Sequence, residues 1–283
     1  MKQPTIGVFD SGFGGLTVLK ALLEVLPEAE YLYFGDTARL PYGSKSVETV
    51  ARYACEAAKF LEQQGANLLV IACNTATALA IEQIKKASSV EVVGVIQPGA
   101  QRAAEASRSR KVVVIGTEAT TRSHAYRNAL AALQVEAHEK ACPLLVPLVE
   151  EGWVNHPVTE EIARIYLGEA FRDGFAEADV LLLGCTHYPL LKAMLQRVVA
   201  SGVTMVDSAE STALAVKAVI VKAVIVKAVI NVTDSRPNVR SVNQASRSAL
   251  KFFVTDSTEK FSRLGKIFLD REITNIVHVD LKE

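Results

Sequence analysis

Short runs of apolar residues alternate along the chain with longer stretches in which apolar residues recur every three or four positions. A short apolar run between polar residues predicts a buried strand, whereas the longer period predicts an amphipathic helix. Strands are predicted at residues 5–9, 31–35, 67–72, 91–96, 111–116, 179–184, 203–206 and 251–255. Helices are predicted at residues 16–25, 47–63, 77–86 and 159–171. Another helix is predicted to begin at residues 256–259, where Asp-Ser-Thr-Glu resembles a capping box. This alternation predicts an α/β fold with mostly parallel sheets flanked by helices.

The two halves of the chain contain similar pieces. Each half has a strand followed by a loop of small and polar residues, and a second strand that ends at a cysteine. The matching strands are 5–9 with 111–116, and 67–72 with 179–184. We therefore expect two pseudo-symmetric domains with the active site in the cleft between them. The predicted domains are residues 1–98 with 208–283, and residues 99–207.

A short repeat interrupts the helical periodicity. The sequence Val-Lys-Ala-Val-Ile at residues 216–220 occurs again at 221–225 and 226–230. Five residues turn a helix by about 500°, so the lysines of successive copies share no helix face. We interpret the repeat as a duplicated gene segment that lengthens a peripheral helix by about 15 Å, without catalytic lysines. The polar stretch that follows, to residue 248, is predicted to be a loop.

Composition and charge narrow the class of protein. The 283 residues are 49% hydrophobic and 22% charged, and 31 basic residues balance 31 acidic ones. A net charge of zero gives no electrostatic footprint for nucleic acid or for an anionic membrane, so we expect neither as a partner. The first strand is too short for a signal-peptide core or a membrane span. With four cysteines in a chain of this length, we expect no disulfide framework and a cytoplasmic location.

Two of the four cysteines are candidates for chemistry. Cys73 and Cys185 each follow an apolar strand, and open α/β sheets place their ligands at the carboxyl ends of strands. Amide N–H groups and the helix dipole at such a junction favour a thiolate. Cys55 lies among alanines on a predicted helix and Cys142 lies in an apolar stretch, so both are interpreted as core residues. Two similarly placed thiols predict that each thiol acts on a different side of one substrate.

The glycine-rich loop at residues 10–15 does not match a nucleotide-binding motif. Its spacing is G-x-G-G rather than G-x-G-x-x-G, and the sequence has no G-x-x-x-x-G-K-[ST]. We expect its backbone N–H groups to approach a small anion such as a carboxylate. Asp10 either acts on a substrate cation or a nearby thiol, or caps the following helix.

A histidine follows the second candidate thiol. His187 lies two residues after Cys185, and the other histidines show no spacing that would complete a metal site with this pair. His187 is therefore better explained as a group that shifts the pKa of the Cys185 thiol than as a metal ligand. We expect neither a metal nor a cofactor.

Four motifs, in order, resemble those of glutamate racemase. They occupy residues 10–15, 35–43, 72–76 and 184–189, and the similarity covers residues 5 to about 215 and resumes near 250. The resemblance implies a cofactor-independent amino-acid racemase, an isomerase of two pseudo-symmetric α/β domains whose partner is a small-molecule substrate, glutamate. It also implies that D-glutamate supplies peptidoglycan synthesis, and thus cell-wall biogenesis and cell shape, and that the chain forms a homo-oligomer.

The resemblance also implies residue roles. It makes Cys73 and Cys185 the two acid/base thiols, Asp10 the assistant of Cys73, and His187 with Glu150 the assistants of Cys185. Motif alignment favours Glu150 over the neighbouring Glu151. The implied substrate-holding residues are Asp10, Ser11, Tyr42, Gly43, Asn74, Thr75, Thr117, Thr120, Thr186 and His187.

The chemistry of inversion agrees with these roles. Inverting an α-carbon needs a base on one face and an acid on the other, and a thiol with an ordinary pKa of about 8.5 can serve as either. Without a Schiff-base cofactor, oriented N–H and hydroxyl donors must stabilise the developing carbanion.

Three alternatives stay open at this point. Aspartate racemases share the two-cysteine plan, although the Thr-His-Tyr-Pro run after the second cysteine favours glutamate. A thiol-dependent decarboxylase or isomerase on the same fold is the second alternative. The third is a gyrase-binding inhibitor, as some glutamate racemases are. Those members are associated with extra terminal sequence, and the first strand here begins by residue 5.

Overall fold

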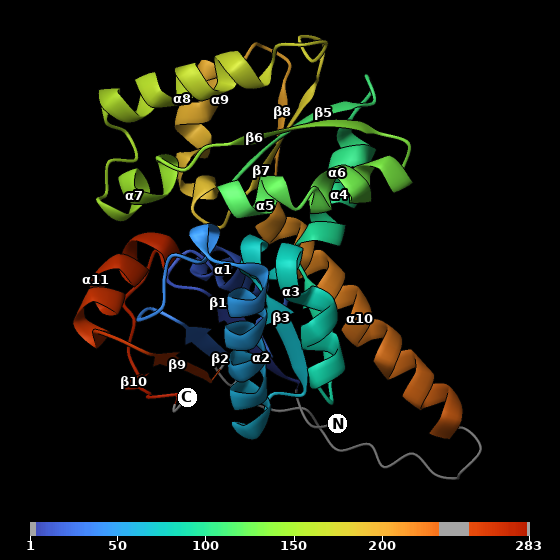
Figure 1. Ribbon diagram of the computed structural model, residues 1–283. Coiled ribbons are helices and arrows are strands. Elements are labelled where there is room, and N and C mark those ends of the chain that lie inside the picture. The colour runs from blue at the N-terminus through green and yellow to red at the C-terminus, as the bar shows by residue number, and fades with distance from the viewer. Residues whose placement is uncertain (1–3, 232–248, 282–283) are drawn as a thin grey trace.

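The computed structural model describes residues 4–231 and 249–281. In it the chain forms two sheets of parallel strands, and one sheet lies above the other in Figure 1. The first sheet has the strand order β10-β9-β2-β1-β3-β4, and the second has the order β6-β5-β7-β8. Every strand pairing in the described ranges is parallel. The predicted α/β class with mostly parallel sheets is confirmed.

The strands of the first sheet are β1 (Thr5–Asp10), β2 (Glu30–Gly35), β3 (Leu68–Ile71), β4 (Glu91–Gly94), β9 (Leu250–Val254) and β10 (Ile276–His278). Those of the second are β5 (Lys111–Gly116), β6 (Glu136–Ala141), β7 (Val180–Gly184) and β8 (Thr204–Asp207). The longer helices are α1 (Leu16–Val25), α2 (Val47–Gln63), α3 (Asn74–Ala87), α4 (Ile96–Ala106), α8 (Pro157–Ala170), α10 (Ser208–Asn231) and α11 (Thr258–Leu269). The shorter ones are α5 (Glu118–Arg122), α6 (Ala125–Ala132), α7 (Leu145–Glu150), α9 (Lys192–Val198), and the 3₁₀ turns η1 (Tyr42–Ser44) and η2 (Tyr188–Leu191).

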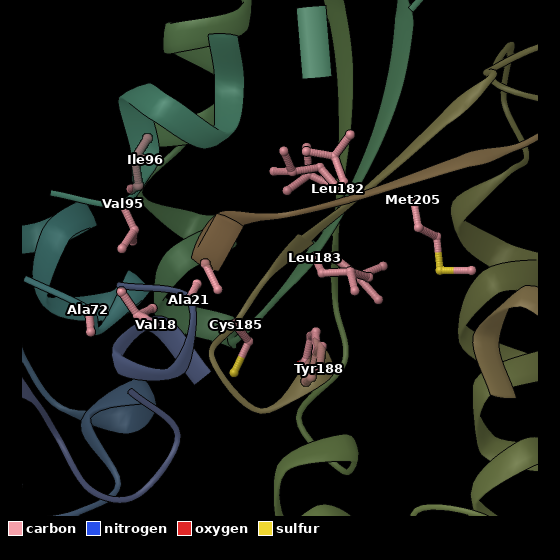
Figure 2. Packing of buried hydrophobic residues seen from close by; sticks show 14 of the residues in the cluster. Val18, Ala21, Ala72, Val95, Ile96, Leu182, Leu183, Cys185, Tyr188 and Met205 are labelled. Atoms are coloured by element: carbon pink, nitrogen blue, oxygen red, sulfur yellow. The ribbon is translucent and has the colours of Figure 1, made fainter. Parts of the chain in front are cut away.

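Both faces of the first sheet are covered. Side chains of β1 and β3 that point to one face pack with α2 and α3, and those that point to the other pack with α1, α10 and α11. Burial on both faces explains why these strands are continuous apolar runs in the sequence. The cluster on the α1 side continues into the second sheet, and Figure 2 shows Val18 and Ala72 of the first half in the same cluster as Leu182 and Leu183 of the second. The packed core therefore runs from one half to the other.

Several predicted boundaries are wrong. The strand predicted at 91–96 ends at Gly94, because α4 begins at Ile96. The helix predicted from residue 77 begins at Asn74, because Cys73 is its N-cap. The capping box is confirmed: Ser257 caps α11 and accepts a hydrogen bond from the Lys260 N–H.

The chain crosses from the first sheet to the second and later returns to the first. It leaves the first sheet after β4 and returns to it after β8, through α4 and α10 respectively. Residues 98 and 99, where one domain limit is predicted, lie within α4, and residues 207 and 208 mark the end of β8 and the start of α10. The domain limits themselves remain a prediction.

The repeat lies within α10, the long helix that extends past the body of the molecule in Figure 1. The early part of α10 is packed, with Ala213 and Val216 fully buried. Beyond it, Val221 and Ile225 are 47% and 56% exposed. The predicted loop lies almost entirely in residues 232–248, outside the described residues.

Deleting residues 221–230 is expected to leave the activity implied by the resemblance within a few-fold of the parent. The described side chains of this segment, at 221–225, are exposed and do not line the cavity described below. The measurement is the rate of glutamate racemisation, with circular dichroism as the control for folding. A folded deletion variant without turnover would contradict the peripheral role.

Candidate active site

A cavity of about 390 Å³ lies between the two halves. The carboxyl ends of β1 and β3 contribute residues from one side, and those of β5 and β7 contribute residues from the other. Open α/β sheets bind ligands at this edge, and here two such edges face one another. Residues that line the cavity are Ser11, Gly12, Leu40, Pro41, Tyr42, Gly43, Ser44, Cys73, Asn74, Thr75, Thr117, Glu118, Pro143, Val146, Pro147, Glu150, Cys185, Thr186 and His187.

Cys73 lies at the start of α3, just after β3. Its sulfur accepts a hydrogen bond from the Ala76 N–H and donates one to Ser11 Oγ, each at 3.4 Å. A helix N-terminus favours a thiolate. Burial outweighs this effect and, with the nearby Asp10 carboxylate, raises the pKa of Cys73 to about 12. The thiol therefore holds its proton at neutral pH, as an acid must before it reacts.

Asp10 is the last residue of β1 and lies behind the cavity wall. Its Oδ2 accepts a hydrogen bond from the Gly12 N–H at 2.9 Å, and it also interacts with the Gly15 N–H. Its Oδ1 has no hydrogen-bond partner among the described residues. Burial raises the pKa of Asp10, although His187 and these backbone N–H groups oppose the shift. The Asp10 carboxylate thus holds the glycine-rich loop through its backbone N–H groups, while Oδ1 makes no hydrogen bond to the described residues.

Cys185, His187 and Glu150 form a chain of contacts on the other side of the cavity. The Cys185 sulfur lies 3.8 Å from His187 Nδ1, and His187 Nε2 lies 3.0 Å from Glu150 Oε1. Burial opposes a charge on the imidazole. The contacts with Cys185 and Glu150 outweigh burial and raise the pKa of His187 to about 10. A positively charged imidazole therefore lies next to the Cys185 sulfur.

The loop that carries Cys185 and His187 is held by both halves. Thr17 of α1 donates a hydrogen bond to the Thr186 carbonyl at 3.1 Å. A Cβ atom on Gly14 would lie 2.6 Å from His187 Nδ1, so the loop approaches as closely as it does because residue 14 is glycine. Tyr188, beside Cys185 in Figure 2, bonds the carbonyl oxygens of Gly116 and Cys142 at 3.2 and 2.8 Å.

Threonine hydroxyls join the halves across another wall. Thr75 Oγ1 lies 2.9 Å from Thr117 Oγ1 and 3.3 Å from Thr120 Oγ1. Thr75 and Thr117 line the cavity, whereas Thr120 is fully buried behind them. Because each hydroxyl both donates and accepts, the cluster can reorient its donors toward a bound carboxylate.

Residues 6–216 match the family model of Asp/Glu/hydantoin racemases. The chain belongs to this racemase family. It is 55% identical to the glutamate racemase of Koribacter versatilis over 99% of this chain and 98% of that one. It is 45% identical to the glutamate racemase of Geobacter metallireducens over 100% and 98%. The crystal structure of Francisella tularensis glutamate racemase in complex with D-glutamate is 33% identical with a TM-score of 0.84, covering 99% of this chain and 98% of that one.

In this racemase most of the predicted site residues lie around one cavity. Glu150 contacts His187, while the neighbouring Glu151 is exposed. Asp10 and Thr120 do not line the cavity. The cavity also has an apolar wall made by Leu40, Pro143, Val146 and Pro147, which the sequence did not predict. Leu40 lies within the motif at residues 35–43, but an apolar side chain carries no chemical mark of a cavity wall before the loops fold over it.

Two other kinds of site are absent from the part of the racemase that the structure describes. Within residues 4–231 and 249–281, no group of three or more His, Cys, Asp or Glu side chains is arranged to hold a metal ion. No helix in the same ranges is long and apolar enough to span a membrane.

Proposed function

We propose that the cavity interconverts L-glutamate and D-glutamate by moving the α-proton between Cys73 and Cys185. The observation that carries the proposal is that two thiols from the two opposed sheets line one cavity of substrate size. The glutamate racemases of Koribacter versatilis and Geobacter metallireducens, which match nearly the whole chain, support glutamate as the substrate. The Picrophilus torridus aspartate racemase, at 18% identity and a TM-score of 0.54, shares the fold alone.

In the proposed reaction one sulfur is a thiolate and the other a thiol. The thiolate takes the α-proton, so an S–H bond forms, the C–H bond breaks, and the electron pair stays on the α-carbon and its carboxylate. The opposite thiol then donates its proton to the other face, which leaves it as the thiolate. By resemblance, Cys73 deprotonates D-glutamate and Cys185 deprotonates L-glutamate.

The two thiols reach their reactive states by different means. Cys185 lies beside His187, whose raised pKa keeps a positive charge near the sulfur. Cys73 lacks such a neighbour, and burial together with Asp10 disfavours its thiolate. A substrate ammonium bound in the cavity near Cys73 would offset the negative charge of Asp10 behind the wall and so oppose one of the two causes. Substrate binding would thereby prepare Cys73 to act as a base.

The carbanion needs donors that are already oriented. Hydroxyls of Ser11, Thr75 and Thr117 line the cavity, as does the amide of Asn74. In a buried site such donors stabilise developing negative charge more strongly than water does, because they need no reorganisation. We assign these residues, with Tyr42, Gly43, Thr186 and the backbone of the glycine-rich loop, to holding the two carboxylates of glutamate.

Further proposals rest on the family. We propose that the chain acts in the cytoplasm as a homo-oligomer and that its D-glutamate supplies peptidoglycan synthesis. We also propose two domains, residues 1–98 with 208–283 and residues 99–207.

The test is incubation with L-glutamate and, separately, D-aspartate, followed by chiral analysis. We expect glutamate to approach an equal mixture of enantiomers and aspartate to stay largely unchanged. The activity should survive exhaustive chelation, and the protein should show no pyridoxal phosphate absorbance. Faster inversion of aspartate, or activity that depends on added metal or pyridoxal phosphate, would contradict the proposal.

A further inference from the structure

Three buried side chains from distant parts of the sequence form a short hydrogen-bond network. The Tyr126 hydroxyl donates to Asn74 Oδ1 at 2.7 Å, and Asn74 Nδ2 donates to Ser208 Oγ at 3.5 Å. Tyr126, Asn74 and Ser208 are 0%, 3% and 1% exposed. With a partner at each end of its amide group, Asn74 is fixed in one orientation.

This network lies where the two halves and both connecting helices meet. Asn74 begins α3 in the first half, Tyr126 belongs to α6 in the second, and Ser208 begins α10, which returns the chain. A Cβ atom on Gly99, in the other connecting helix α4, would lie 3.3 Å from the Tyr126 oxygen. The Tyr126 hydroxyl therefore lies against α3 and against the helix that leads out of the first half.

Tyr126 also connects the surroundings of the two thiols. Its ring packs so closely on Gly184, the residue before Cys185, that a Cβ atom there would lie 2.9 Å from a ring carbon. Its hydroxyl bonds Asn74, the residue after Cys73. One rigid side chain thus spans from the neighbour of one thiol to the neighbour of the other.

This network determines which way the Asn74 amide points. Burial raises the pKa of Tyr126 far above neutral pH, so its hydroxyl remains a donor. The Asn74 oxygen must accept that hydrogen bond, and the amide nitrogen is turned away from it. This nitrogen carries two N–H bonds, of which Ser208 receives one. The second remains for a ligand in the cavity, which Asn74 lines.

We propose that Tyr126 is a positioning residue of the racemase, which holds the Asn74 amide as a donor toward the substrate. The inference rests on the proposed function, because it assigns Asn74 to the substrate glutamate. It predicts that loss of the hydroxyl weakens substrate binding and turnover without loss of the fold.

The test compares Tyr126→Phe with Tyr31→Phe. Tyr31 is a matched control, since it is fully buried and its hydroxyl bonds the carbonyl oxygens of Leu22 and Leu26 at 2.9 and 2.8 Å, away from the cavity. Both variants should unfold at a lower temperature. Tyr126→Phe should lower kcat/KM for glutamate by roughly tenfold or more, chiefly through KM, because a buried amide loses its partner. Tyr31→Phe should leave kcat and KM unchanged.

A double-mutant cycle with Asn74→Ala separates positioning from general destabilisation. If Tyr126 acts through Asn74, Tyr126→Phe should change kcat/KM by less than about twofold in the Asn74→Ala background. Losses that multiply, or an unchanged KM in folded Tyr126→Phe, would overturn the inference. If Tyr126→Phe does not fold, Ser208→Ala removes the other partner of the Asn74 amide and must raise KM for the inference to stand. An inactive parent chain in the same assay would instead contradict the proposed function.

Discussion

Replacing either Cys73 or Cys185 with serine is expected to lower glutamate racemisation by at least about a hundredfold, the scale of one general acid–base group. Serine preserves the shape of the side chain, but its hydroxyl is a far weaker acid than a thiol. The variant therefore cannot supply the thiolate that removes the α-proton from one enantiomer. Both thiols are needed in either direction of the reaction, so each substitution should abolish most of the turnover by itself. The measurement is the rate of loss of optical rotation with either enantiomer.

The other two cysteines provide controls for this experiment. Cys142 is fully buried, and its thiol donates a hydrogen bond to the Lys140 carbonyl oxygen. Cys55 is partly buried on α2. Neither cysteine lines the cavity. Cys142→Ser and Cys55→Ser should affect stability alone. A hundredfold loss of turnover in folded Cys55→Ser would contradict the assignment of the chemistry to Cys73 and Cys185.

Replacing His187 with glutamine is expected to lower racemisation by about ten- to a hundredfold at neutral pH. The substitution removes the cation that lies 3.8 Å from the Cys185 sulfur, so the thiolate on that side becomes harder to form. It also removes the partner of Glu150, which lies 3.0 Å from the imidazole. Glu150→Gln serves as a second variant. It removes a negative charge that favours the protonated form of His187 but leaves the imidazole ring in place, so its effect should be smaller. Equal racemisation by the parent and His187→Gln would contradict the role of His187.

The same substitution should change how stability depends on pH. The pKa of His187 is raised to about 10 in the folded chain, against about 6.5 in an unfolded one. The folded state therefore binds the extra proton, and its contribution to stability is complete below pH 6.5 and is lost as the pH rises toward 10. Urea unfolding of the parent from pH 6 to 10 should show this decline in the free energy of unfolding, and His187→Gln should show less of it. Parallel pH profiles would contradict the raised pKa.

The sequence predicted the central strands of both sheets better than their edges. The strands β1, β3 and β7 are buried on both faces and form uninterrupted apolar runs. The edge strand β6 has the sequence Glu-Ala-His-Glu-Lys-Ala, in which one residue is buried, and no apolar run marks it. The edge strand β10 is three residues long. The other two edge strands, β4 and β8, were predicted because each contains a short apolar run. An edge strand without such a run, like β6, does not differ in composition from a loop.

The candidate site was predictable where chemistry coincides with a strand end. Cys73, Cys185, Asp10 and His187 follow apolar runs and carry reactive side chains, so pattern and chemistry marked them together. The partners that orient Asn74 could not be predicted, because Tyr126 and Ser208 are 52 and 134 residues away in the sequence. The resemblance placed Thr120 among the substrate-holding residues, and in the structure it lies behind the cavity wall, bonded to Thr75 and Thr117.

Racemisation rates alone cannot assign a face of the substrate to each thiol. The two enantiomers are equal in free energy, so the equilibrium constant is one and any substitution must lower kcat/KM equally in both directions. An elimination substrate removes this constraint, because a glutamate analogue with a leaving group on the β-carbon needs one deprotonation and no reprotonation at the α-carbon.

The most direct measurement is therefore the rate of elimination from each enantiomer of such an analogue by the two serine variants. The opposed-thiol account predicts that Cys73→Ser still acts on the L form through Cys185, and that Cys185→Ser still acts on the D form through Cys73. The opposite enantiomer should react at least about a hundredfold more slowly in each variant. Activity of both variants on the same enantiomer would contradict the placement of the two thiols on opposite faces of the substrate.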